Sequence, residues 1–151
     1  MDDEKRKAVV GRTSPISILV VEDELITARS VEVGLKGTGY QVVSVTSSGE
    51  EALRKAEQLR PDLVLMDIKL DGFMDGVYAA QRIQAQLGIP VIYMTAYSDD
   101  ETLRRVKQSR VYGYVVKPFT ERDLLRAIES TLDQYRAGRR ADDRREHWHA
   151  A

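Results

Sequence analysis

The chain has 151 residues and a formal net charge of −1, with 42% hydrophobic and 31% charged residues. This composition predicts one globular domain with a buried core and excludes wholesale disorder. The near-neutral charge gives no general attraction to nucleic acid or to an anionic membrane, so neither is expected as a partner. The absence of cysteine excludes disulfides and thiolate chemistry and agrees with a reducing compartment.

The two ends of the chain differ in charge from its middle. Residues 1–12 and 136–151 are basic, which leaves the middle with a formal charge of −4. We predict a charged tail over 1–14, one domain over 15–136 and a mobile basic tail over 137–151. No segment has the apolar core of a signal peptide or the length of a membrane span, so a cytoplasmic location is expected.

Short apolar runs alternate with amphipathic segments in the first half of the chain. The expected elements are the strands Ile16–Val21, Gln41–Thr46 and Leu63–Met66 and the helices Leu25–Leu35 and Ser48–Arg60. Leu25, Ala28, Val31 or Glu32, and Leu35 are spaced like one face of the first of these helices. Ser48 and Glu51 have the spacing of a capping box and indicate where the second helix begins.

The same alternation continues to residue 135. The expected elements are the strands Pro90–Met94 and Gly113–Val116, the helix Val77–Leu87, a polar helix from a capping box at Ser98 to about Ser109, and a final helix beginning at Thr120. An apolar stripe on the final helix ends at Tyr135. Asp71 and Asp75 are expected as ordinary turn or cap residues. The side chains expected as solvated surface charge are Lys69, Arg104, Arg105, Lys107 and Arg110.

Five strands alternating with five helices predict a doubly wound α/β fold. The strands are parallel, because helical crossovers join them, and helices cover both faces of the sheet. In such sheets ligands bind at the carboxyl ends of the strands, near the point where the strand order reverses. We therefore look for the functional site at those ends.

Charged and hydroxyl side chains follow four of the predicted strands. Glu22 and Asp23 follow the first strand, Asp67 the third, Thr95 the fourth and Lys117 the fifth. If these ends converge, each pair of carboxylates repels by roughly 4 kcal/mol at about 4 Å and an effective dielectric near 20. A cation is needed to offset this repulsion.

All-oxygen ligands and an open acidic cluster suit Mg²⁺, which binds few protein carboxylates together with water and phosphate oxygens. Asp67 is then placed to accept a phosphoryl group as an acyl phosphate, with Lys117 as a second positive charge and Thr95 as a hydroxyl donor. Taken alone, Glu22 and Asp23 also suit a solvated helix start, where the helix dipole favours acids. Their combination with the other strand ends favours the metal site.

Several runs resemble a response-regulator receiver domain, in matching order over about residues 16–135. They are Ile18-Leu-Val-Val-Glu-Asp-Glu24, Asp62-Leu-Val-Leu-Met-Asp67, Val91-Ile-Tyr-Met-Thr-Ala96 and Gly113-Tyr-Val-Val-Lys-Pro118. The resemblance implies a flavodoxin-like fold with strand order 2-1-3-4-5. It also implies that Asp67 is the phosphoacceptor and that Glu22, Asp23, Asp67 and the backbone carbonyl of Lys69 bind Mg²⁺.

The resemblance also implies a switch. Thr95 and Lys117 would bind the phosphoryl group, and Tyr114 matches the aromatic residue that turns inward on activation. The Lys117–Pro118 bond resembles one that is cis in the family. Taken alone, Tyr114 also suits an ordinary packed strand aromatic. The loop after Asp67 is one residue longer than in the commonest receivers.

The implied function is a two-component receiver phosphorylated by a histidine kinase or a histidine phosphotransfer protein. It would be no enzyme beyond phosphorylating itself from phosphodonors and dephosphorylating itself. The helix ending near Ser109, the strand Gly113–Val116 and the helix from Thr120 would form the face for a downstream target or a second copy.

Two alternatives remain open. One is a receiver-fold interaction module that binds partners without phosphoryl cycling. The other is a nucleotide-binding protein or a metal-dependent phosphatase, which the sequence disfavours because it has no glycine-rich phosphate loop and because Lys69 stands where such phosphatases have a second aspartate.

Overall fold

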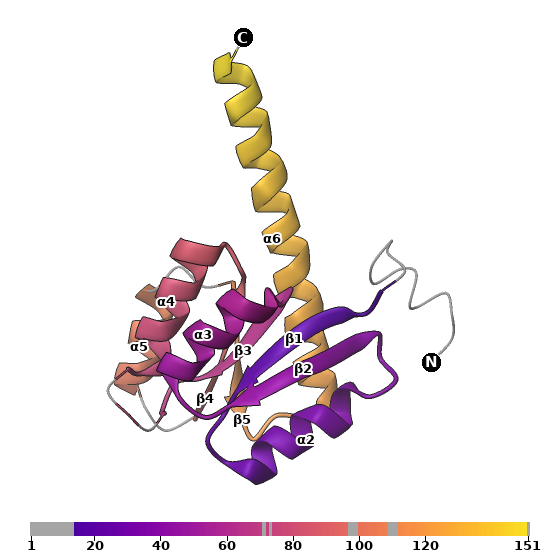
Figure 1. Ribbon diagram of the computed structural model, residues 1–151, viewed down its shortest axis with the longest axis vertical. Coiled ribbons are helices and arrows are strands. Elements are labelled where there is room, and N and C mark those ends of the chain that lie inside the picture. Colours follow the sequence, from indigo (N-terminus) through magenta and orange to yellow (C-terminus); the bar gives the residue numbers. More distant parts are fainter. Residues whose placement is uncertain (1–13, 71, 73, 97–99, 109–111, 151) are drawn as a thin grey trace.

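The computed structural model describes residues 14–70, 72, 74–96, 100–108 and 112–150. Strands and helices alternate along the chain (Figure 1). In chain order they are β1 (Ile16–Val21), α2 (Leu25–Leu35), β2 (Tyr40–Thr46), α3 (Gly49–Leu59), β3 (Leu63–Asp67), α4 (Gly76–Leu87), β4 (Val91–Ala96), α5 (Asp100–Gln108), β5 (Gly113–Lys117) and α6 (Glu121–Ala150). The described elements confirm the predicted doubly wound α/β fold.

The five strands form one parallel sheet in the order β2-β1-β3-β4-β5. This is the order that the resemblance implied. The chain leaves β1 toward one edge of the sheet and returns at β3 toward the other, so the order reverses between these two neighbours. Their carboxyl ends therefore border the crevice where ligands of such sheets bind.

Alternating strand residues build two separate cores. Ile18 and Val20 of β1 face α2 and α6, whereas Leu19 and Val21 face α3, α4 and α5. All four side chains are fully buried. Since successive side chains of a strand point to opposite faces, a strand that is apolar throughout must be covered on both sides. The two helical layers meet this requirement and fix the sheet that positions the strand ends.

Side-chain caps begin several helices where the sequence indicated. The hydroxyl of Ser48 accepts a hydrogen bond from the Glu51 N–H at 3.2 Å. At the start of α6, the Thr120 hydroxyl accepts from the Asp123 N–H while the Asp123 carboxylate accepts from the Thr120 N–H. These bonds satisfy backbone donors that a helix leaves free at its first turn. The capping box predicted at Ser98 lies outside the described residues.

The structure corrects two expectations. Leu25 is 84% exposed and lines a surface groove, whereas Ala28, Val31 and Leu35 of the same predicted helical face are buried. The segment 137–151, expected as a mobile tail, is helical through Ala150. The prediction ended the helix at its last apolar position, but the alanines and arginines that follow Tyr135 have good helix propensity. Figure 1 shows this part of α6 extending away from the sheet.

Candidate functional site

Three acidic side chains meet at the carboxyl edge of the sheet. Glu22 and Asp23 follow β1, and Asp67 is the last residue of its neighbour β3. One carboxylate oxygen from each lies within 4.8 Å of the others. Glu22 and Asp67 are buried and Asp23 is half-buried, so the cluster opens to solvent on the side of Asp23. The predicted convergence of these acids is confirmed.

Lys117 brings a positive charge into this cluster from the end of β5. Its Nζ lies 2.6 Å from Glu22 Oε1 and 3.3 Å from Asp67 Oδ2. The ammonium thus bridges the two buried carboxylates, Glu22 and Asp67, while Asp23 lies on the side of the cluster that faces solvent. In the part of the chain that the structure describes, the buried Glu22 Oε2 has no hydrogen-bond partner.

The electrostatics of the cluster show a shortage of positive charge. The pKa of Glu22 is raised to about 8, first by burial and then by the neighbouring Asp67 carboxyl group, and Lys117 offsets only part of this. Burial by itself would lower the pKa of Lys117, but Glu22 and Asp67 hold it above its usual value. One ammonium therefore does not balance these acids, and their oxygens are suited to a hard divalent cation.

Thr95 lies near the same edge of the sheet as the cluster, whereas Tyr114 lies on the surface. Thr95 is buried near the end of β4, and its hydroxyl donates to the Ala96 carbonyl at 3.4 Å. The register pairs Ala96 with Lys117, which brings the ends of β4 and β5 together. The side chain of Tyr114 is 43% exposed, so it is not packed as an ordinary core aromatic.

The loop after β3 ends close to Asp67, where the chain enters α4 at Gly76. The Lys69 N–H donates to Asp67 Oδ1 at 3.3 Å, and the Gly76 N–H donates to the Ile68 carbonyl at 3.1 Å. A Cβ atom at Gly76 would lie 2.0 Å from the Asp67 carbonyl oxygen. Only glycine therefore permits the start of α4 to lie this close to the strand end. The Lys69 side chain is exposed, as expected.

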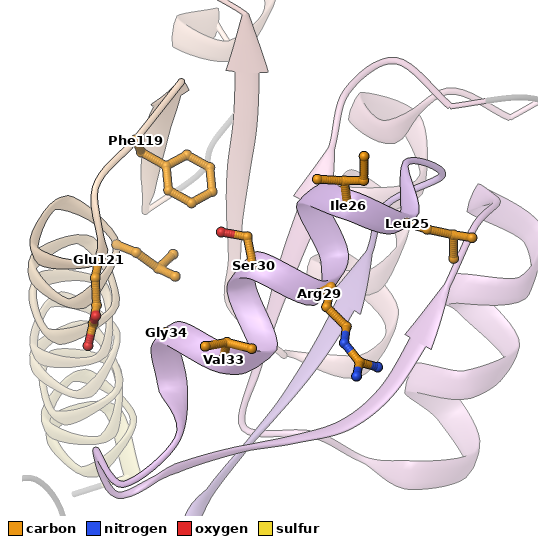
Figure 2. Close-up of a pocket in the computed structure, with 9 residues that line it drawn as sticks. Leu25, Ile26, Arg29, Ser30, Val33, Gly34, Phe119 and Glu121 are labelled. Carbon is orange, nitrogen blue, oxygen red and sulfur yellow. The ribbon is translucent and has the colours of Figure 1, made fainter.

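A groove with an apolar lining begins beside the acidic cluster. Figure 2 shows it between α2 on one side and, on the other, the start of α6 with the segment that leads into it. Its volume is about 590 Å³. Leu25 and Ile26 are 84% and 86% exposed at one end, and Phe119 and Leu124 line the opposite side. Sequence reasoning missed this groove, although two adjacent apolar residues directly after an acidic run were a visible signal.

Sequence reasoning also missed an ion pair near the site. Asp75 is the N-cap of α4, as its predicted role requires, and its Oδ1 accepts from the Tyr78 N–H at 2.9 Å. Its Oδ2 lies 2.7 Å from Arg105 Nη2 on α5. Arg105 is exposed, as expected of a surface charge, but the sequence did not indicate its ion pair, since no local pattern relates residues 30 positions apart. Asp71 lies outside the described residues.

The Lys117–Pro118 peptide bond is cis, in agreement with the resemblance. Within the described ranges, every helix is too short or too polar to cross a bilayer.

Comparison with known proteins identifies the family. The model of the response regulator receiver domain matches residues 18–129. The transcriptional regulatory protein PdtaR of Mycobacterium tuberculosis is 34% identical over 122 residues, which are 81% of this chain and 59% of that protein. The DNA-binding response regulator MtrA of Mycobacterium leprae is 33% identical over 126 residues, which are 83% and 52% of the two chains. The chain thus spans between half and three-fifths of the length of these relatives.

Solved structures agree with this assignment over nearly their whole length. The signal receiver domain of a modulated diguanylate cyclase from Desulfovibrio desulfuricans G20 is 38% identical with a TM-score of 0.76, over 83% of this chain and 99% of that one. A response regulator N-terminal domain from Carboxydothermus hydrogenoformans is 36% identical with a TM-score of 0.72, over 81% and 98%. The chain belongs to the response regulator receiver domains of two-component signalling systems.

Proposed function

We propose that this receiver is controlled by phosphorylation of Asp67, with a histidine kinase or a histidine phosphotransfer protein as donor. The observation that supports this most strongly is the position of the Asp67 carboxylate between Lys117 and the acids that follow β1. In the transfer, a carboxylate oxygen of Asp67 attacks phosphorus, an O–P bond forms, and the N–P bond to the donor imidazole breaks. The electrons of that bond remain on the imidazole nitrogen.

The acidic cluster fits a bound Mg²⁺ ion. Glu22, Asp23 and Asp67 offer carboxylate oxygens close together, and Glu22 Oε2 is buried without a partner among the described residues. The Lys69 carbonyl is the proposed fourth protein ligand. Bound Mg²⁺ would neutralise charge on the phosphoryl oxygens and on Asp67.

The remaining site residues of this chain have separate tasks in the proposal. Lys117 holds the Asp67 carboxylate in place and presents its ammonium to a phosphoryl oxygen. The Thr95 hydroxyl, whose hydrogen bond to the Ala96 carbonyl is 3.4 Å long, would turn toward the phosphoryl group. Tyr114 would then move inward from its exposed position, a population shift driven by the new charge.

The test uses acetyl phosphate as donor. With MgCl₂, intact-protein mass spectrometry should detect one added phosphoryl group, and Asp67→Asn should abolish the addition. Asp100→Asn, at an exposed carboxylate of α5, is the matched control and should be phosphorylated like the wild type. No addition to the wild-type chain, or an addition that persists in Asp67→Asn, overturns the proposal.

The groove beside the cluster is the proposed contact surface for the donor protein. Leu25 and Ile26 project at its rim only a few residues beyond Asp23, so a helix seated there would bring a phosphohistidine to the site. Ile26→Asp should therefore slow transfer from the cognate donor by at least about tenfold, while phosphorylation by acetyl phosphate stays unchanged. Val43→Asp, on the edge strand β2, is the control. Equal transfer to both variants would contradict this docking surface.

The competing function is an interaction module that never cycles phosphate. The cluster of Asp67, Lys117 and the acids disfavours it, because a module without phosphoryl chemistry gains nothing from buried, mutually repelling carboxylates. A downstream partner or a second copy would bind the face formed by α5, β5 and α6, where Tyr114 is exposed. Partner affinity that is indifferent to phosphorylation would favour the competing function.

A further inference from the structure

The loop between Asp67 and α4 contains Lys69, whose carbonyl the proposed function assigns to the metal. Its first residues are held from within, since the Lys69 N–H bonds to Asp67 and the Gly76 N–H bonds back to Ile68. The described residues farther along the loop, Gly72, Met74 and Asp75, need other anchors, because a segment held at one end alone would sample many backbone arrangements. Two neighbouring helices supply such anchors.

The first anchor is the beginning of α3. Glu50 Oε1 accepts a hydrogen bond from the Met74 N–H at 3.0 Å. The loop also passes closely over this carboxylate at Gly72, where a Cβ atom would lie 3.3 Å from Glu50 Oε2 and where φ is +104°. A Cβ atom at Gly49 would lie 2.8 Å from the Met74 carbonyl oxygen. Gly49 and Glu50 thus hold the loop at Met74. Gly49 leaves space for the Met74 backbone, and Glu50 accepts the hydrogen bond of the Met74 N–H.

The second anchor comes from α5. Arg105 Nη2 contacts Asp75 Oδ2 at 2.7 Å while the other oxygen of Asp75 caps α4. Asp75 directly follows Met74 in the chain, so two consecutive loop residues are bound by two different helices. Both helices pack on the same face of the sheet as α4.

We propose that Glu50 and Arg105 are positioning residues for the phosphoryl-transfer site, which hold the outer end of the loop and so set where the Lys69 carbonyl lies relative to Asp67. The inference rests on the proposed function, because it assigns a role toward the same Mg²⁺ and phosphoryl chemistry. Neither side chain contacts the acidic cluster in this structure. Groups that hydrogen-bond to metal ligands alter the metal affinity without contacting the metal. The same reasoning applies to groups that position a loop whose backbone carbonyl is a ligand.

The test is a titration of the ¹⁵N-labelled full chain with MgCl₂, followed by NMR through the amide signals of Lys69 and Gly76. Glu50→Ala and Arg105→Gln should each raise the Kd for Mg²⁺ by about tenfold. Glu50→Gln should restore wild-type affinity, because its amide oxygen still accepts from Met74, and Arg105→Lys should restore most of it.

The matched controls are Glu57→Ala on α3 and Arg104→Gln on α5, which remove the same charges at exposed positions of the same helices. Both should bind Mg²⁺ within about twofold of the wild type. The amide spectrum of Glu50→Ala shows whether this variant is folded, since an unfolded chain would show no native signals. Recovery of Mg²⁺ affinity in Glu50→Gln then assigns the loss in Glu50→Ala to the missing hydrogen-bond acceptor.

Phosphorylation by acetyl phosphate is measured in parallel. If Glu50→Ala and Arg105→Gln bind Mg²⁺ like their controls while the wild type is phosphorylated on Asp67, the positioning role is overturned and the proposed function stands. If the wild-type chain neither binds Mg²⁺ nor gains a phosphoryl group, the proposed function fails and this inference fails with it.

Discussion

At the scale of single residues, Gly76 sets the tightest limit on the surroundings of Asp67. An added Cβ would lie 2.0 Å from a backbone oxygen and 2.8 Å from the Ile68 Cα, neither of which is a flexible side-chain end. We expect Gly76→Ala to lower the free energy of unfolding by about 3 kcal/mol, measured by urea denaturation.

Gly88→Ala is the control for this prediction. Gly88 has φ of +67° but open space around it, so alanine there suffers backbone strain without a clash. Its expected cost is about 1 kcal/mol. Equal losses in the two variants would show that the close approach at Gly76 is relieved without cost.

At Thr131 we expect a substitution that stabilises the protein. Its hydroxyl is buried and, within the described part of the chain, has no hydrogen-bond partner. We expect Thr131→Val to raise the free energy of unfolding by about 1 kcal/mol, because it removes an unpaired polar group at nearly constant volume. Thr131→Ser, which keeps the hydroxyl and loses the methyl group, should destabilise. A destabilising Thr131→Val would indicate that the hydroxyl is satisfied in solution.

At the scale of elements, the ion pair between α4 and α5 predicts a pH dependence. Partial burial alone would raise the pKa of Asp75, but the Tyr78 N–H and Arg105 together bring it below its usual 3.8. The folded state therefore binds a proton less readily than the unfolded state. The resulting stability is present above about pH 4 and is lost as the pH falls through the folded pKa.

Asp75→Asn tests this dependence, because asparagine keeps the helix cap and removes the charge. Urea denaturation at several pH values should show wild type more stable than the variant at pH 7, with a difference that shrinks toward pH 3. A difference that does not change with pH would show that the charge of Asp75, and with it the ion pair, does not contribute to the stability.

The helix starts show why local signals in the sequence were reliable. Ser48 and Thr120 cap their helices with bonds to residues only three positions away. Such contacts depend on the local backbone alone, so their pattern is visible in the sequence. The pairing of Asp75 with Arg105 joins two helices and residues 30 positions apart, and no periodic pattern in the sequence predicts it.

At the scale of the whole molecule, the core ends well before the last turn of α6. Up to Arg139, the last residue whose burial the structure describes, Leu132 is the last buried side chain, and the Tyr135 hydroxyl donates to the Gly88 carbonyl nearby. The helix has 30 residues, about 45 Å in length, and its second half extends away from the sheet.

A chain shortened to end at Arg139 should therefore keep the unfolding free energy of the full chain within about 0.5 kcal/mol. Circular dichroism should detect the loss of helix, while urea denaturation and phosphorylation by acetyl phosphate stay unchanged. A large loss of stability would show that residues 140–151 contact the domain.

The sequence by itself determined the α/β alternation, and the residues proposed for the site could be named from the strand ends. Apolar runs and caps are local, and parallel strands bring their carboxyl ends to one edge whatever the details of packing. Only the tertiary structure decided that Lys117 bridges Glu22 and Asp67, that Leu25 borders a groove, and that α3 and α5 hold the loop after Asp67. These features depend on distances between segments far apart in the chain, which are set by how the helices pack on the sheet.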